Sequence, residues 1–356
     1  MSTPAPSAPT RLVLPIQYLR GIAAVMVVWF HAVEQVPGTK AFLSSGFGNS
    51  GVDLFFVISG FIMVATTFEK PPSPVEFLRR RAIRVAPLYW LLTLAMVGAA
   101  LCLPRLFKTL VVAPDTLLMS LLFIPHYSAS FPTMAWPLLV PGWTLNYEMF
   151  FYLLFACTLV LPARHRLAAL AGACVALVAA GLAFGPFANA VARTYTSPML
   201  LEFAAGAAIG TWWVRRRKMP PAAVAAAAVV IGFALLVLRD QPPLGGYTQM
   251  CGAVLAVAGA LHPAFAALRL PGLRTLGDAS YSLYLTHLFA LGVLRVLWTR
   301  AVPVVDSGAL AAAWMALALV ACAAVGVLSY RWIETPMLHR LNALTSRRRT
   351  LAAARA

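Results

Sequence analysis

Repeated apolar segments of about 17 residues or more decide what this chain can fold into. Each is about long enough to cross the ~30 Å hydrocarbon layer of a bilayer as a helix. The apolar runs are continuous rather than alternating, which favours helices over a β-barrel, the other structure that satisfies backbone polar groups in lipid. We therefore expect an all-α, polytopic integral membrane bundle of about ten transmembrane helices. The expected spans are residues 13–33, 51–68, 83–103, 143–161, 167–184, 198–214, 222–239, 246–262, 280–298 and 308–330.

The positions of the basic residues orient this bundle. The chain carries 28 Lys and Arg against 11 Asp and Glu, a net charge of +17. With ten spans and a cytoplasmic N-terminus, 20 basic residues fall in cytoplasmic segments, six in outer loops and two, Arg20 and Arg295, within spans. This agrees with the positive-inside rule. Counting the short apolar stretch 116–125 as an eleventh span would move most basic loops outside, so we interpret it as re-entrant or interfacial.

The same distribution predicts the domain organisation and excludes some partners. We expect both termini in the cytoplasm, a disordered tail over 1–12 with no cleaved signal peptide, one membrane domain over 13–340 and a basic tail over 341–356. The basic blocks between spans suit anionic lipid headgroups, so the charge does not indicate nucleic acid. The five cysteines and six histidines lack CxxC or metal-like spacing, and we predict no metal.

The first expected span carries two polar side chains, Arg20 and His31, in an otherwise apolar run. Their spacing of eleven leaves them about 20° apart around a helix and about 16 Å apart along it. One arginine can snorkel or pair with a carboxylate, and one histidine can be a hydrogen-bonded core residue. Two on one face also fit a site in which Arg20 binds the phosphates of a donor and His31, near the outer end, acts as a general base.

The stretch GNSGVDLFFVISGFIM over 48–63 opens the second span with small residues. Asp53 either caps or charges the helix N-terminus or, because it lies at the outer end like His31, orients that histidine. Ser59, in the Ser59-Gly60-Phe61 step, is better explained as a packing or kink residue than as a nucleophile, because the sequence implies no neighbouring base.

The basic cluster FLRRRAIR begins the third span. A positive-inside anchor beside interfacial aromatic residues explains most of it. It does not explain why Arg81 and Arg84, three positions apart on one helix face, run into the membrane. Recognition of phosphate by these two side chains is the second hypothesis.

Glu148 lies among aromatic residues in PGWTLNYEMFFYLLF. An intramembrane carboxylate is a candidate functional group, and Glu148 could orient His31 or act as the base itself. The alternative is an ion pair with Arg20 or Arg295. Glu202 has the same ambiguity. His287, in DASYSLYLTHL, is explained by hydrogen bonding within the bundle, and we do not assign it a catalytic role.

Taken together, these segments resemble the membrane-bound acyltransferase 3 family, which includes bacterial O-acyltransferases of cell-surface polysaccharides. The resemblance covers about residues 13–340, and IQYLRG, SLLFIPH and NYEMFFY resemble its exopolysaccharide-modifying subgroup. Five elements carry it, in order: LRGIAAVMVVWFHA, GVDLFFVISGF, FLRRRAIRVAPLYW, GWTLNYEMFFYLLF and DASYSLYLTHL.

The resemblance implies a reaction and a location. Family members transfer an acyl group, usually acetyl from cytoplasmic acetyl-CoA, to a sugar hydroxyl of a polysaccharide or lipid-linked precursor. The family's essential arginine and histidine match Arg20 and His31. The implied protein is a multi-pass enzyme of the bacterial inner membrane, with polysaccharide-assembly membrane proteins as possible partners. The implied donor-binding residues are Arg20, Ser59, Arg81 and Arg84.

We therefore expect His31, oriented by Asp53 or Glu148, to deprotonate a sugar hydroxyl that attacks the acyl carbonyl, with an acyl-histidine intermediate as the alternative. A transporter or flippase of lipid-linked sugars, which makes no bond, also fits the composition. Release of CoA that depends on the acceptor separates the two classes.

Overall fold

The computed structural model describes residues 13–104, 109–215, 219–238 and 247–353, with side chains described as far as Thr345. In this part of the chain the regular structure is entirely helical, as expected. The main helices are α1 (Leu14–Gln35), α3 (Gly51–Thr67), α4 (Pro74–Cys102), α6 (Trp143–Thr158), α7 (Ala163–Phe184), α9 (Leu200–Val214), α10 (Ala222–Val237), α11 (Tyr247–Ala260), α14 (Ser280–Ala301), α15 (Gly308–Ser329) and α16 (Thr335–Ala353). The shorter elements are η1 (Thr39–Ala41), α2 (Gly46–Asn49), α5 (Pro114–Leu121), η2 (Val140–Gly142), α8 (Ala190–Tyr195), α12 (Pro263–Ala266), α13 (Pro271–Asp278) and the π-helical turn η3 (Tyr330–Glu334).

Among the described residues, six helical segments are long and apolar enough to cross a membrane: α1, α2 with α3, α4, α7, α14, and α15 continued by α16. The other four expected spans coincide with α6, α9, α10 and α11, which have 14 to 16 residues. At about 1.5 Å per residue these helices are about 21 to 24 Å long, so the count of ten stays a prediction. The helix in the stretch 116–125 is α5, which begins at Pro114, ends at Leu121 and, with eight residues, is too short to span.

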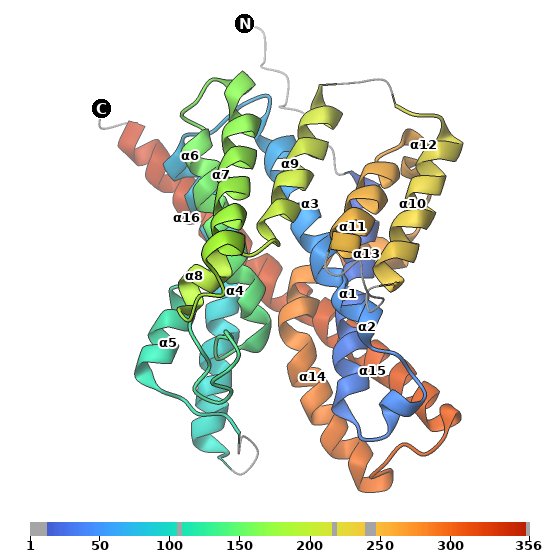
Figure 1. Ribbon diagram of the computed structural model, residues 1–356. Coiled ribbons are helices and arrows are strands. Elements are labelled where there is room, and N and C mark those ends of the chain that lie inside the picture. Colours follow the sequence, from blue (N-terminus) through green and yellow to red (C-terminus); the bar gives the residue numbers. More distant parts are fainter. Residues whose placement is uncertain (1–12, 105–108, 216–218, 239–246, 354–356) are drawn as a thin grey trace, which may run out of the picture.

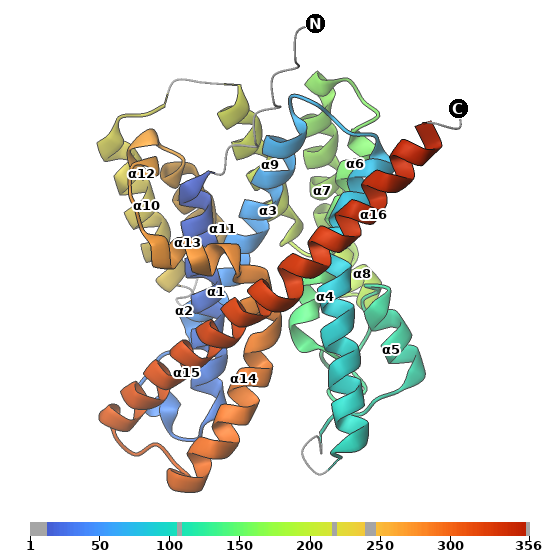
Figure 2. The ribbon, with the colours of Figure 1, turned by 180° about the vertical axis from the view of Figure 1, so that it is seen from behind.

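Helices α7, α9, α10 and α11 lie in one half of the molecule and α5 and α14 in the other (Figure 1), and the start of α1 and the end of α16 lie in the same half as α7 and α9. The loop from α3 to α4 and the end of α9 lie in that half as well, whereas the connection from α14 to α15 lies at the opposite end. Seen from behind, α15, η3 and α16 form one long oblique rod across the bundle (Figure 2). The described part of the C-terminal segment is therefore helical as far as Ala353.

Many large apolar side chains face outward. Leu94 on α4, Phe184 on α7, Val230 on α10 and Val320 on α15 are all at least half exposed. A water-soluble protein rarely exposes so much contiguous apolar surface, whereas lipid is a suitable neighbour for it. The chain is thus a multi-pass helical membrane protein.

Close approach of α3 and α9 explains the glycine in the Ser59-Gly60-Phe61 step. A Cβ built on Gly60 would lie 2.1 Å from the Phe203 carbonyl oxygen, and one on Gly206 would lie 2.0 Å from the Val57 carbonyl oxygen. Small residues allow membrane helices to pack backbone against backbone in this way. Gly60 therefore serves packing, which leaves its neighbour Ser59 free to point to a different side of α3.

Two helix boundaries differ from the expected ones. Helix α4 begins at Pro74, nine residues before the expected span, because Ser73 caps it by accepting from the Glu76 amide. The basic cluster is therefore helical. The last span does not stop near 330, because the π-helical turn η3 carries it directly into α16. Pro336, which has no backbone N–H to donate, follows η3 by two residues, where the regular α-helical hydrogen-bond pattern is already interrupted.

Candidate active site

Arg20 and His31 both face α14. The Arg20 guanidinium donates to Ser280 Oγ (2.8 Å) and, more weakly, to Gln17 Oε1 (3.3 Å). Further along α1, His31 Nδ1 lies 3.3 Å from His287 Nε2. The expectation that the two side chains share one face of the first helix is confirmed. Their common partner, α14, could not be read from the spacing.

A cavity of about 200 Å³ opens between α1, α3, α4, α6 and α14. Five of the residues singled out in the sequence line it, although they come from four different helices. The aromatic residues Phe55, Phe56, Tyr152, Tyr281 and Tyr284 complete much of its wall. The five are Arg20, Ser59, Arg81, Arg84 and Glu148.

Glu148 is held from two sides within this cavity. Its Oε1 accepts from Ser59 Oγ (2.9 Å) and from the Tyr152 hydroxyl (2.8 Å). These contacts differ from two of the three predictions for this carboxylate, since its hydrogen bonds go neither to His31 nor to an arginine. Ser59 thus acts as a hydrogen-bond donor to Glu148 rather than only as a packing residue.

Arg81 lines the cavity, and its guanidinium makes a hydrogen bond and two aromatic contacts. It donates to Thr66 Oγ1 (3.0 Å) and lies over the rings of Phe77 (5.3 Å) and Tyr152 (5.7 Å). Aromatic faces stabilise a cation without neutralising its charge. The geometry is consistent with the predicted recognition of a phosphate.

Arg84 has a different environment from the one expected. It forms an ion pair with Glu334, which is 1% exposed and which also accepts from Ser282 Oγ (2.5 Å). The guanidinium also lies 5.3 Å from the centre of the Tyr281 ring. Sequence reasoning missed Glu334, because it follows the last expected span among charged residues. Its place in a π-helical turn, a feature common at functional sites, is the signal that the structure adds.

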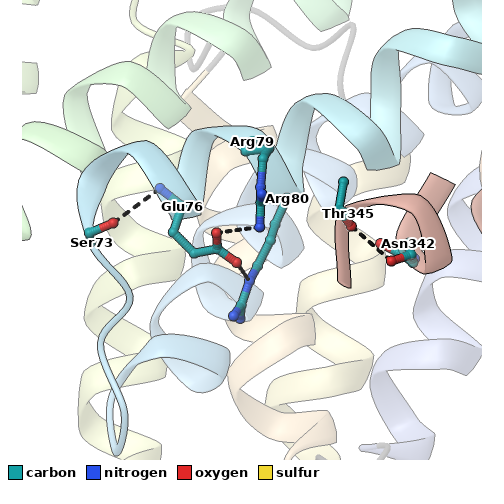
Figure 3. Close-up of polar contacts among 6 residues, drawn as sticks. All are labelled: Ser73, Glu76, Arg79, Arg80, Asn342 and Thr345. Carbon is teal, nitrogen blue, oxygen red and sulfur yellow. Dashed lines mark hydrogen bonds and ion pairs between the residues drawn. The ribbon is translucent and has the colours of Figure 1, made fainter. Parts of the chain in front are cut away.

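The other half of the basic cluster is bound locally, at the start of α4 (Figure 3). Glu76 accepts from Arg79 (2.5 Å) and from Arg80 (2.6 Å). These are helix-surface pairs of spacing three and four. The cluster is therefore divided into a locally paired half and a half, Arg81 and Arg84, that lines the cavity.

The contacts of the His31 ring come from α1 and α14. Its Nδ1 lies 2.9 Å from the Val27 carbonyl oxygen and 3.3 Å from His287 Nε2, and its ring meets that of Phe30 edge-on at 5.0 Å. Asp53 lies buried in the first turn of α3, where the favourable interaction of a carboxylate with a helix N-terminus applies. In the described part of the chain, the side chain that contacts His31 from another helix is therefore His287.

A second hollow lies beside the end of α1. It is lined by Phe30, next to His31, and by η1, α2 and the loop between them, including Lys40, Phe42, Ser44, Ser45 and Asn49. Lys40 and Ser45 both contact Glu34. Asn49 lines this hollow while Val52, three residues later, lines the cavity. The two depressions thus lie on either side of the turn between α2 and α3, and His31 lines neither of them.

The fold and the site define an integral membrane protein with an arginine-lined cavity and, outside the lining of that cavity, two histidines in contact, His31 and His287. Residues 14–331 match the acyltransferase domain of the acyltransferase 3 family. The chain is 42% identical over 317 residues to the exopolysaccharide production protein ExoZ of Rhizobium meliloti (strain 1021), covering 87% of this chain and 94% of that protein.

Two further relatives also carry the names of acyl-transferring enzymes. The putative membrane-bound transacylase BcsY of Komagataeibacter xylinus is 31% identical over 339 residues (90% of this chain, 81% of that protein). The acyltransferase MdmB of Streptomyces mycarofaciens is 28% identical over 390 residues (94% and 93%). No solved structure shows a significant match. The chain belongs to the acyltransferase 3 family and is a membrane-bound acyltransferase.

Proposed function

We propose that this acyltransferase moves an acetyl group from cytoplasmic acetyl-CoA to a sugar hydroxyl of an exopolysaccharide or of its lipid-linked precursor. The observation that carries the proposal is the convergence of Arg20, Ser59, Arg81 and Glu148 on one cavity. Its wall includes Tyr284, whose carbonyl oxygen contacts His287, the neighbour of His31. Similarity to an exopolysaccharide production protein supports the class of acceptor. Membership of an acyltransferase family favours this reading over a flippase.

The cavity suits the part of an acyl-CoA that runs from its phosphates to its thioester. Arg81 and Arg20 are the cations that would hold phosphate oxygens, because Arg84 is engaged by Glu334. The apolar and aromatic wall suits the less polar arm that carries the thioester. A volume of about 200 Å³ accommodates only part of the donor, so the nucleotide would remain towards the cytoplasmic opening.

His31 is the proposed general base. In the proposed reaction His31 accepts the proton of the sugar hydroxyl, the sugar oxygen forms a bond to the acyl carbon, and the carbon–sulfur bond breaks. The leaving thiolate then takes the proton from His31, which regenerates the free imidazole. In the acyl-histidine alternative, the ring nitrogen of His31 that would accept the proton first attacks the acyl carbon and displaces the thiolate, and the sugar oxygen then takes the acyl group from His31.

The hollow lined by Phe30 and Phe42 is the proposed approach of the acceptor. It combines an exposed aromatic ring, 44% exposed in Phe42, with hydroxyl, amide and ammonium groups. Rings of this kind offer an apolar face to a sugar, and the polar groups offer hydrogen bonds to its hydroxyls. We expect Phe42→Ala to raise the KM for the acceptor and to leave the KM for acetyl-CoA unchanged.

The proposed setting is the bacterial inner membrane, with about ten spans and both termini in the cytoplasm. The position of the start of α1 and the end of α16 in one half of the bundle supports an even number of crossings. Lipid-linked sugars and polysaccharide-assembly membrane proteins are the proposed partners.

Inverted membrane vesicles given acetyl-CoA labelled in the acetyl group test the proposal. Label transferred to alkali-sensitive polysaccharide is measured for the wild type, His31→Ala and Arg81→Gln, with His165→Ala and Arg80→Gln as surface controls. We expect His31→Ala to lose about 10²- to 10⁴-fold in rate, as removal of a general base does. Arg81→Gln should raise the KM for acetyl-CoA while the controls behave as the wild type.

Two results would overturn the proposal. Transfer of the labelled acetyl group by His31→Ala at the wild-type rate would show that His31 is not the general base. A wild type that moves lipid-linked sugar without releasing CoA from any acyl-CoA would favour the flippase instead.

A further inference from the structure

We propose that His287 is a positioning residue that fixes the hydrogen of His31 on Nδ1 and so presents the unprotonated Nε2 to the reacting group. This inference rests on the proposed function of His31. Its basis is a chain of three contacts that join α1 to α14.

The first step concerns His287 itself. It is 0% exposed, and its Nδ1 lies 2.7 Å from the Tyr284 carbonyl oxygen. A carbonyl oxygen only accepts, so His287 Nδ1 must carry a hydrogen. In the neutral ring the other nitrogen, Nε2, then has a free lone pair, and this is the atom that faces His31.

The second step gives the state of His31. Its Nδ1 lies 2.9 Å from the Val27 carbonyl oxygen and 3.3 Å from His287 Nε2. Both neighbours are acceptors, so the His31 Nδ1–H is shared between them. The hydrogen cannot move to Nε2 without leaving two buried acceptors facing a bare lone pair. His31 Nε2 is therefore the free nitrogen, in the form that a general base or a nucleophile requires.

The third step is the effect on the reaction. When His31 takes a proton on Nε2, its ring becomes cationic, and the bonds from Nδ1 to Val27 and His287 become charge-assisted and stronger. His287 thus stabilises the protonated base without touching the substrate. Cys322 Sγ on α15 donates to the backbone carbonyl oxygen of His287 at 3.8 Å, so it contacts the main chain of α14 at this point and not the imidazole ring.

The test compares His287→Leu, His287→Gln and the packing control Cys322→Ala in purified, folded protein. Leucine fills similar space but cannot accept from His31, whereas the glutamine oxygen can. A charge-assisted hydrogen bond contributes about 1.5–3 kcal/mol, which is about 10- to 100-fold in rate. We expect His287→Leu to lower kcat by that factor with the KM for acetyl-CoA unchanged. His287→Gln should retain more of kcat, and Cys322→Ala should match the wild type.

A second measurement does not depend on acyl transfer. The rate at which diethylpyrocarbonate modifies His31, followed by the mass of the α1 peptide, reports the nucleophilicity of Nε2 even if acetyl-CoA is not the donor. We expect His287→Leu to slow this modification several-fold and His287→Gln to slow it less. Equal kcat and equal modification rates in His287→Leu and Cys322→Ala would overturn the inference, and so would a His287→Gln variant no better than His287→Leu.

Discussion

The buried ion pair between Arg84 and Glu334 yields the most quantitative prediction. Removing one partner of a buried pair costs about 3–5 kcal/mol, because the remaining charge is left uncompensated. The Arg84 side chain is 34% exposed, so some solvent screening remains, and we expect the lower end, about 3 kcal/mol, for Glu334→Leu. Where this loss of stability acts mainly by raising the unfolding rate, the half-life of the folded protein in detergent shortens up to about 100-fold.

The double variant Arg84→Met with Glu334→Leu separates a lost charge pair from lost packing. Replacing both members with apolar side chains should restore most of the half-life. Glu34→Gln, which removes only the exposed pair with Lys40, is the control and should change stability by less than about 1 kcal/mol. The measurement is the fraction of monodisperse protein after timed incubation at a fixed temperature. A Glu334→Leu variant as stable as Glu34→Gln, or a double variant no better than the single one, would refute the reasoning.

Two further predictions concern the packing and the cavity. Gly60→Ala should strongly reduce the amount of folded protein in membranes, because the new Cβ meets a carbonyl oxygen of α9 at 2.1 Å, whereas Gly98→Ala, with nothing within 4 Å, should be tolerated; equal yields would argue against the close α3–α9 packing. Tyr152→Phe, which removes one of two hydrogen bonds to Glu148, should lower kcat/KM by about 10-fold or more. Tyr195→Phe, stacked on Phe150 outside the cavity, should not, and a Tyr152→Phe enzyme with wild-type kinetics would remove Glu148 from the site.

What could be predicted from the sequence is what depends on distance along one helix. The shared face of Arg20 and His31 follows from helical periodicity alone, and it is confirmed by their contacts with α14. The long spans follow from the length of their apolar runs.

What could not be predicted depends on which helices pack together. His287 lies 256 positions from His31, and Glu334 lies 250 positions from Arg84. Both pairs cross interfaces with α14 or η3, and hydropathy carries no information about helix order in the bundle. Hydrogen bonding within the bundle therefore explained the histidine in its apolar run equally well, and the glutamate after the last span received no assignment, until the packing was known.

Helix α14 takes part in both regions, because it contacts Glu334, the partner of Arg84, and also carries His287, the partner of His31. The first turn of α14 contacts Arg20 through Ser280 and Glu334 through Ser282, and its second and third turns carry Tyr284 and His287 towards His31. One helix thus contacts both Arg20, at the cavity, and His31, which lies outside the lining of the cavity. A distortion of α14 should therefore impair donor binding and kcat together, whereas loss of the His287 ring alone should affect kcat only. Measuring both constants in the same variants distinguishes a helix that positions two sites from one that merely supports the bundle.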